Sequence, residues 1–537
     1  MKWLNHYYNQ LLELNFKTWV VSILMIWLPI SNLAVQYVVN VRSGPTLISN
    51  IKDLLIVGLI INLSIEIYLM IRTRIEYPGK SLPQKAIELI RPCLPLLIVL
   101  LLNILAISSS FIFNRVGIKI FVIGYYFELF WLDLLAIWLT WNSLRMSHKP
   151  QTGSIELGLI PAKALLIKGF DWSVIIRSVW IGFVFVAIVS LASIGFGQVK
   201  VLSNFGYGLS DTGGLVSSNN PCHKLDYGID TCRLMGSFGH PLHFVSYLLM
   251  VLGVLLSQIV LVKDFRLRAF YAALVVLNLI FIYLSHTRFA IFGLVLILFW
   301  LVFGWGGSYL NREYLFFGRI IRLMIAKFAM LFALIVILIT TIFVLNIDIN
   351  TYFPAVASQL PKSLTKPSSS AWHIRQTSSN LQVIKDSPSK LLTGFGLGTA
   401  GSAARSKYQN LETNPIYQKL VAQGKFYPDM IQNYIIIPDN WLIQTSLNGG
   451  LLYTLAYLVL LLWPLSYIWQ LIKLDAWNNL SVARGFLICA LLGILVGNLV
   501  QQLFESQVTV FFFVVVCGLL NTRAVVEPKN LSSTTIN

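Results

Sequence analysis

Long apolar runs constrain this chain more than any other feature, because about twelve of them approach the roughly 20 residues that a helix needs to cross a bilayer. Of the 537 residues, 56% are hydrophobic and only 12% are charged, whereas a soluble domain carries about 25% charged residues. The runs lie near 18–40, 54–71, 93–113, 120–142, 174–196, 241–262, 269–284, 289–305, 323–346, 451–471, 485–503 and 507–521. The sequence therefore predicts an all-α polytopic membrane protein with about 12 transmembrane helices.

The chain is strongly basic, with a formal net charge of +18. Its Lys and Arg residues lie in the segments between the apolar runs, where membrane orientation and contact with anionic lipid account for them. Nucleic acid is therefore not expected as a partner. Basic residues are more frequent on the side that holds the N-terminus, which predicts that both termini are cytoplasmic.

Three parts follow from this topology. Residues 1–346 form an N-terminal membrane bundle of about nine spans with an outer loop at 197–240, and residues 451–537 form about three further spans and a cytoplasmic tail. Residues 347–450 form a large, partly helical outer loop. Long ordered loops in a compact protein are usually functional, so we expect chemistry in this loop.

Polar side chains in unusual places suggest pairing. Cys222 and Cys232 share the loop 197–240 and can form a disulfide if that loop faces an oxidising compartment. A metal site with His223 is the alternative, although no second CxxC or HxxxH accompanies it. Three acids, Glu66, Glu128 and Asp133, lie inside predicted spans, where we expect interhelical pairing, with Arg177 or a hydroxyl, rather than a proton path.

Four polar elements lie on the predicted outer side. They are Arg233–Pro241 before a span, Ser285-His286-Thr287-Arg288 between two spans, Arg375 followed by Gly394-Phe395-Gly396-Leu397-Gly398, and Pro438-Asp439-Asn440-Trp441-Leu442 followed by Asn448-Gly449-Gly450. A guanidinium between two apolar runs, such as Arg288, is costly near hydrocarbon and usually has a partner or a function. Structural roles compete with functional ones: Arg288 as a headgroup anchor, Asp439 as a helix N-cap, and the Gly-rich stretch as a tight turn.

In this order and spacing, the four elements resemble those of the O-antigen ligase and O-antigen polymerase superfamily of bacterial envelope proteins. That family shows G-x-F-x-H/N-P before a span, an S-x-S/T-R turn, an Arg followed by G-x-G-x-G, and an H/D-N-x-x-L element with glycines after it. The resemblance covers roughly residues 230–470. The ligase branch usually has His where this chain has Asp439, which favours the polymerase branch.

The resemblance implies a glycosyltransferase that needs neither metal nor cofactor. It would transfer oligosaccharide repeat units from an undecaprenyl diphosphate carrier to a sugar hydroxyl of another lipid-linked glycan, on the periplasmic face of the bacterial inner (plasma) membrane. Its partners would be the carrier-linked oligosaccharide, membrane lipids and other polysaccharide assembly proteins. One alternative is ligase-type transfer to a lipid A-core or protein acceptor, and the non-enzyme alternative is a polysaccharide transporter or flippase.

The chemistry of this transfer assigns roles to residues. Negative charge develops on the diphosphate leaving group, and Arg contacts phosphate through two N–H groups. Arg288 and Arg375 are therefore the expected catalytic cations, and Asp439 is the expected base for the acceptor hydroxyl. Expected contacts to diphosphate or substrate come from Arg233, His240, Arg405, Lys407, Gly394, Gly396 and Asn440.

Overall fold

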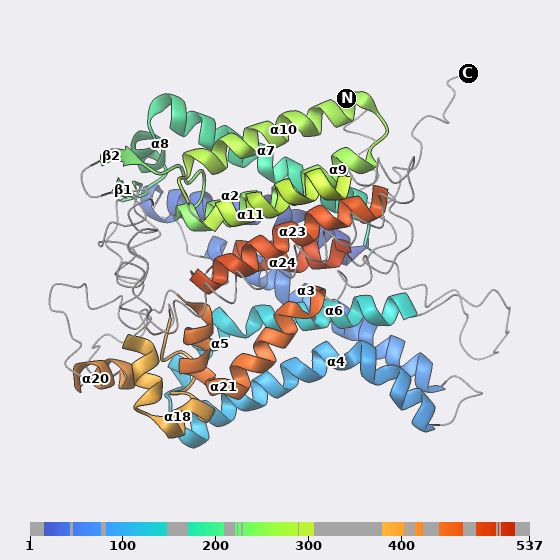
Figure 1. The fold of residues 1–537 in the computed structure, drawn as a ribbon, viewed down its shortest axis with the longest axis vertical. Coiled ribbons are helices and arrows are strands. Elements are labelled where there is room, and N and C mark those ends of the chain that lie inside the picture. Colours follow the sequence, from blue (N-terminus) through green and yellow to red (C-terminus); the bar gives the residue numbers. More distant parts are fainter. Residues whose placement is uncertain are drawn as a thin grey trace.

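The computed structural model shows a bundle of long, roughly parallel and antiparallel helices (Figure 1). It describes residues 15–42, 47–76, 82–147, 170–208, 221–222, 224–226, 229–287, 289–305, 379–401, 404, 414–422, 440–465, 479–500, 503 and 506–520. Within these ranges, eight helices are long and apolar enough to cross a membrane, or nine if one bent pair is a single span. The all-α, multi-pass membrane class is therefore confirmed.

Most described residues of the first half of the bundle are helical. Its elements are α2 (Phe16–Gln36) with the π-helix η1 (Tyr37–Val41), α3 (Leu47–Glu76), α4 (Leu82–Ile107) with the π-helix η2 (Ser108–Phe113), α5 (Ile118–Glu128), α6 (Phe130–Ser147), α7 (Trp172–Phe196) and α8 (Gln198–Asn204). A short antiparallel hairpin follows, β1 (Lys224–Asp226) and β2 (Ile229–Cys232), in which Lys224 pairs with Cys232.

The second half contains the remaining long helices. They are α9 (Pro241–Leu261), α10 (Phe265–Leu284), α11 (Phe289–Trp300) with η5 (Leu301–Trp305), α21 (Trp441–Leu462) with η8 (Trp463–Leu465), α23 (Asn479–Val500) and α24 (Gln507–Leu520), and the short helices are α18 (Pro388–Thr393) and α20 (Pro415–Ala422). The count of about twelve spans stays a prediction, because the run 323–346 lies outside the described residues and α11 and α24 are shorter than a full span.

The centre of the bundle is α9. It packs against α23, α10, α24, α11 and α7, and 89% of its apolar window is buried. In α4 only 28% of the window is buried, and Leu97, Leu100 and Ile104 are exposed. A membrane helix with an exposed apolar face contacts lipid, because lipid chains are as apolar as these side chains.

Two spans are broken where polar groups lie. The bent pair α5 and α6 meets at 44° next to Glu128. Helix α21 begins at Trp441, ten residues before the predicted apolar run at 451–471, and a break at Gly450 separates these ten residues from the rest of the helix. The helix changes direction at Gly450 (φ 80°, ψ −177°), where the boundary between outer loop and C-terminal spans was predicted.

The acids in the spans pair between helices. Glu66 accepts from Lys17 Nζ at 2.7 Å and from Trp141 Nε1 at 2.6 Å. Asp133 accepts from Asn103 Nδ2 at 2.9 Å and from the Tyr125 hydroxyl. Pairing of this kind offsets the cost of a carboxylate in a membrane bundle. The sequence suggested Arg177 as the cation that pairs with these acids. The structure instead shows Lys17 as the cation that contacts Glu66.

Candidate functional site

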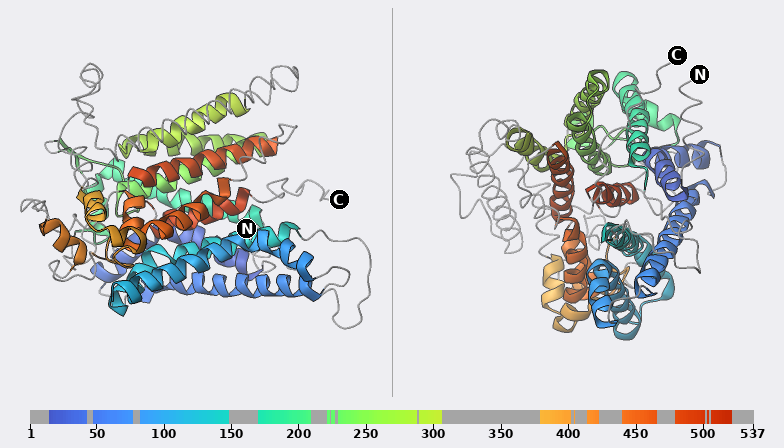
Figure 2. Two further views of the ribbon diagram at one scale, coloured as in Figure 1. Left: turned by 60° about the horizontal axis from the view of Figure 1, so that its bottom comes forward. Right: turned by 90° about the vertical axis from the view of Figure 1, so that its right-hand side faces the viewer.

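A disulfide closes the hairpin at one end of the bundle. Cys222 and Cys232 are bonded, with their Cα atoms 5.0 Å apart. Since the Cys222 sulfur is used in this bond, it cannot be the thiolate of the alternative site with His223. The hairpin lies beside α8, at the same end of the bundle as α18 and α20 (Figures 1 and 2).

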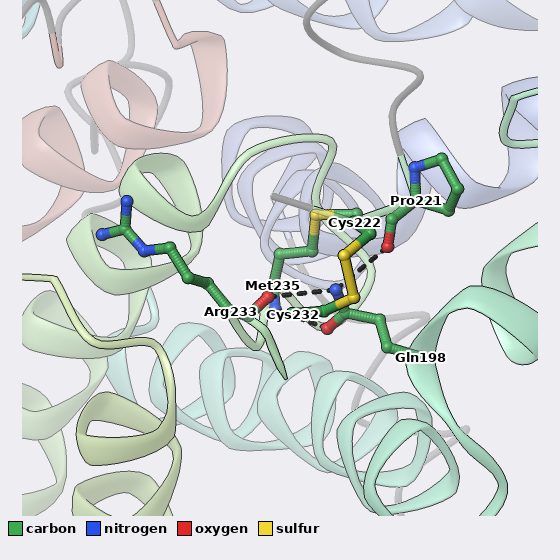
Figure 3. The surroundings of a disulfide bond; sticks show 6 residues. All are labelled: Gln198, Pro221, Cys222, Cys232, Arg233 and Met235. Carbon is green, nitrogen blue, oxygen red and sulfur yellow. Dashed lines mark hydrogen bonds between the residues drawn. A yellow bond between two sulfur atoms is a disulfide. The ribbon is translucent and has the colours of Figure 1, made fainter. Parts of the chain in front are cut away.

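Gln198 connects the disulfide loop to the first of the four polar elements. Its Nε2 donates to the carbonyls of Pro221 and Arg233, both at 3.0 Å, and its Oε1 accepts from the Met235 amide at 3.2 Å (Figure 3). Further along the element, the Tyr207 hydroxyl donates to the Ser237 carbonyl at 3.1 Å. The stretch that precedes α9 is therefore held by side chains of α8 and the turn after it.

The Arg233 side chain holds the turn that leads to Arg288. It points away from the disulfide (Figure 3). Its Nε donates to the Ser285 carbonyl at 3.1 Å, and its Nη2 donates to the His286 carbonyl at 3.0 Å and to Thr287 Oγ1 at 3.1 Å. The first two polar elements thus form one unit that Arg233 holds together, and the predicted phosphate contact of Arg233 stays a prediction.

This turn is conformationally unusual. His286 has φ 48°, a left-handed conformation that is uncommon for a residue other than Gly. Ser285 Oγ donates to the Ile282 carbonyl at 2.7 Å, and the Leu234 amide donates to the Leu284 carbonyl at 3.1 Å. Such a backbone persists only where surrounding contacts over-determine it. The side chain that follows, Arg288, lies outside the described residues.

Loss of the Arg233 fork is expected to loosen this turn. Arg233→Ala leaves the Ser285 and His286 carbonyls without their charged donor, which should lower the free energy of unfolding by about 1–3 kcal/mol. Arg233→Lys should recover only part of the loss, because an ammonium lacks the planar fork. Thermal unfolding of the purified protein in detergent measures the effect. Arg266→Ala, an exposed residue at the other end of α10, is the control, and equal unfolding temperatures for the two alanine variants would contradict the assignment.

His240 and Asn440 both cap helices. His240 Nδ1 accepts from the Leu242 amide at 3.2 Å at the start of α9. Asn440 Oδ1 accepts from the Leu442 and Ile443 amides at 2.9 and 3.3 Å at the start of α21. The N-cap role suggested for Asp439 therefore belongs to Asn440, because Asn440 is the residue before the first helical turn.

The Gly-rich stretch and α21 form a second unit. The Phe395 amide donates to the Leu447 carbonyl at 2.6 Å, and the Gly396 amide donates to the Asn448 carbonyl at 2.9 Å. Asn448 Oδ1 accepts from the Ala400 amide at 2.8 Å. The third and fourth polar elements therefore lie in direct contact.

Close backbone packing explains the glycines of this stretch. Gly394 and Gly396 have φ values of 66° and 100°, and a Cβ on Gly394 would lie 2.5 Å from the Asn448 carbonyl oxygen. The Gly394 amide donates to the Lys390 carbonyl at 2.7 Å, so both glycine amides are already used within the protein. The predicted diphosphate contacts of Gly394 and Gly396 are therefore not supported, and the two residues serve packing.

Five of the predicted site residues cannot be placed. Arg288, Arg375, Arg405, Lys407 and Asp439 lie outside the described residues. Their roles stay predictions. The part of the chain that is described contributes the two units that flank Arg288 and Asp439 in the sequence.

Glu128 belongs to the second unit and was not predicted as a site residue. It is buried at the bend between α5 and α6, and its Oε1 accepts from Gln444 Nε2 at 3.1 Å and from Asn448 Nδ2. Through Asn448 this carboxylate is connected to the Gly-rich stretch. A sequence signal existed, namely an acid inside an apolar run, although its partners are distant in the chain.

A basic cavity lies against the Gly-rich stretch and was missed by sequence reasoning. Its volume is about 790 Å³, and it lies between the loop 114–117, α18 and α20. Its described lining carries three cations, Arg115, Lys390 and Lys419, and no Asp or Glu. Burial lowers the pKa of the Lys390 ammonium. No single segment carries the three cations, so no sequence motif announces the cavity.

Comparison with known proteins adds no relative. No protein family matches this chain, and no curated protein matches it. A function for the chain must therefore be argued from its own residues and their contacts.

Proposed function

We propose that this protein is a membrane glycosyltransferase of the O-antigen polymerase type, which joins lipid-linked oligosaccharide units without metal or cofactor. One observation carries the proposal: four polar elements, far apart in the sequence, form two hydrogen-bonded units at the same end of the bundle (Figures 1 and 2). Proteins of that family use such elements at one membrane face.

The disulfide supports an outward orientation of this end. Disulfides form and persist in oxidising compartments such as the periplasm, and Cys222–Cys232 lies next to the first unit. At the opposite end, Lys263 in the turn between α9 and α10, and Arg266 and Arg268 in the first turn of α10, give the basic charge that the positive-inside rule favours for the cytoplasm. We therefore infer an active face in the periplasm of a bacterial inner membrane and cytoplasmic termini.

The proposed reaction breaks the bond between the anomeric carbon and a diphosphate oxygen and forms a bond to the acceptor hydroxyl oxygen. The diphosphate leaves with the bonding electrons, and Arg288 and Arg375 stabilise its charge. Asp439 accepts the proton of the acceptor hydroxyl as the new bond forms. The fixed turn before Arg288 and the Asn440 cap after Asp439 would restrict where these two side chains can lie.

Purified protein in liposomes tests the function. With undecaprenyl diphosphate-linked oligosaccharide as the sole glycan, we expect products longer by whole repeat units, without added nucleotide. Glycan lengths on a gel, or masses of released glycan, are the measurement. Movement of the substrate across the bilayer without lengthening would support a flippase instead, and product formed only on a lipid A-core or protein acceptor would support a ligase.

A further inference from the structure

The basic cavity beside α18 carries an inference that does not depend on the proposed transferase activity. We propose that it binds the phosphate headgroup of an anionic lipid through Arg115, Lys390 and Lys419. Its volume of about 790 Å³ falls within the range of roughly 300–1,000 Å³ that is usual for ligand sites.

The charges of the cavity call for an anion. Arg115 comes from the loop before α5, Lys390 from α18 and Lys419 from α20. None of these cations forms a salt bridge with an acid in the part of the chain that the structure describes. Three like charges around one cavity repel one another, and a bound phosphate group removes that repulsion while accepting hydrogen bonds from all three side chains.

The walls of the cavity are held in place before any ligand arrives. Asn114 Nδ2 donates to the Ser109 carbonyl at 2.7 Å and to the Gly394 carbonyl at 3.1 Å, and Asn114 Oδ1 accepts from Lys390 Nζ. The Val116 amide donates to the Ser110 carbonyl at 2.8 Å. The cavity thus connects the end of α4 with the Gly-rich stretch, and the Asn114 contacts hold the loop 114–117 and the Lys390 side chain in place.

Arg115 itself has an unfavourable backbone. Its φ of 51° lies in the left-handed region, which a residue other than Gly adopts at a cost. The bond between Val116 and Ser110 spans this residue. Its side chain is exposed, so packing does not explain why an Arg stands here. An exposed cation on this strained backbone at the cavity is accessible to a ligand.

The surroundings favour a lipid over a soluble phosphate. Beside the cavity, Ile112 and Phe113 of η2 are 70% and 56% exposed, and Ile118 of α5 is 69% exposed. They continue the exposed apolar face of α4, which carries Ile104 and Ile107. A free phosphate needs no apolar approach, whereas a lipid does: its chains cover this face while its headgroup reaches the cations.

Binding of labelled phosphatidic acid to the full-length protein in detergent tests the proposal. The cavity variant is Arg115→Gln, Lys390→Gln and Lys419→Gln together. Its matched control is Lys119→Gln, Lys200→Gln and Arg266→Gln, which changes the net charge equally at exposed positions outside the cavity. We expect the cavity variant to bind roughly a hundredfold more weakly and the control variant to bind like the parent protein. Equal binding by the cavity variant and the control would overturn the proposal.

Two further arms separate the sources of phosphate and protect against misfolding. If inorganic diphosphate bound to the cavity as tightly as the lipid, the lipid assignment would be overturned and a soluble anion favoured. The double variant Arg115→Gln, Lys419→Gln leaves the Lys390–Asn114 bond intact. This double variant should bind phosphatidic acid at least about tenfold more weakly than the parent protein, even if the triple variant fails to fold. Parent-like binding by a folded double variant would contradict the proposed lipid site.

Discussion

Replacing Arg288 or Asp439 by alanine is expected to abolish glycan chain lengthening in cells. In the proposed reaction, Arg288 donates hydrogen bonds to the departing diphosphate and stabilises its developing negative charge. Loss of one hydrogen-bond donor of this kind typically lowers the reaction rate by about 10²–10³-fold. In the proposed reaction, Asp439 accepts the proton of the acceptor hydroxyl. Loss of a general base typically lowers the reaction rate by about 10²–10⁴-fold. The length distribution of surface glycan on a gel is the measurement, with membrane fractions probed for the protein.

Conservative variants separate the roles of these two residues. Arg288→Lys keeps the charge without the two-pronged contact, so partial activity is expected. Asp439→Asn keeps the shape without the base, so activity should stay low. Full activity in Asp439→Asn would remove the base role and leave the membrane fold untouched. Arg266→Ala, a cation at the other end of α10, should lengthen glycans normally.

Gly450→Ala is expected to produce a large loss of stability. Gly450 has φ 80° and ψ −177°, a conformation that is essentially restricted to Gly, and a Cβ there would overlap the Leu392 carbonyl oxygen. Backbone strain of about 1–3 kcal/mol and overpacking of about 1–3 kcal/mol together approach the total stability of a marginal protein, about 5–15 kcal/mol. We therefore expect little monodisperse protein after extraction in detergent.

Gly195→Ala is the matched control for this variant. Gly195 lies in α7, and a Cβ there would meet nothing within 4 Å. Because Ala favours a helix over Gly by about 1 kcal/mol, this control should extract as well as the parent protein or better. Size-exclusion profiles after graded heating compare the two. Similar heat resistance in both variants would show that the break in α21 tolerates a side chain.

The break at Gly450 also matters for the second unit. The residues just before it, Leu447 and Asn448, accept hydrogen bonds from the Gly-rich stretch, and Asn448 donates to Glu128. A straight α21 would move these groups away from their partners. The strained backbone at Gly450 is therefore compensated by contacts that join α21 to the Gly-rich stretch 394–400.

The sequence predicted the positions of most long helices, and the differences between predicted and observed positions have physical causes. The start of α9 was predicted correctly, since Pro241 at the first turn and a long apolar run coincide there. The segment of α21 before the break at Gly450 was not part of the predicted run, because Gln444, Thr445 and Asn448 lower its apolarity, although all three are buried in the protein. Polar residues that face other helices form hydrogen bonds with them inside the bundle. A hydropathy pattern alone assigns such residues to a loop.

The site was predicted only in outline. The sequence pointed to Arg233 as a diphosphate ligand, but its guanidinium donates to the turn at Ser285–Thr287. No pattern in a single sequence reveals which carbonyl groups a guanidinium will contact, so this structural role of Arg233 could not be predicted. In the same way, nothing in the sequence indicated that Arg115 and Lys419 would lie at one cavity, because they are far apart in the chain.

The sequence by itself determined that this chain crosses a membrane many times, because bilayer thickness sets the length of an apolar run and each run is read locally. Tertiary structure alone decided which of these helices is central. Helix α4 is at least as apolar as α9, yet α9 is buried in the protein and α4 largely exposed. An apolar side chain is equally well accommodated by lipid and by the protein interior. Only the packing of the other helices therefore decides which apolar helix is central and which contacts lipid.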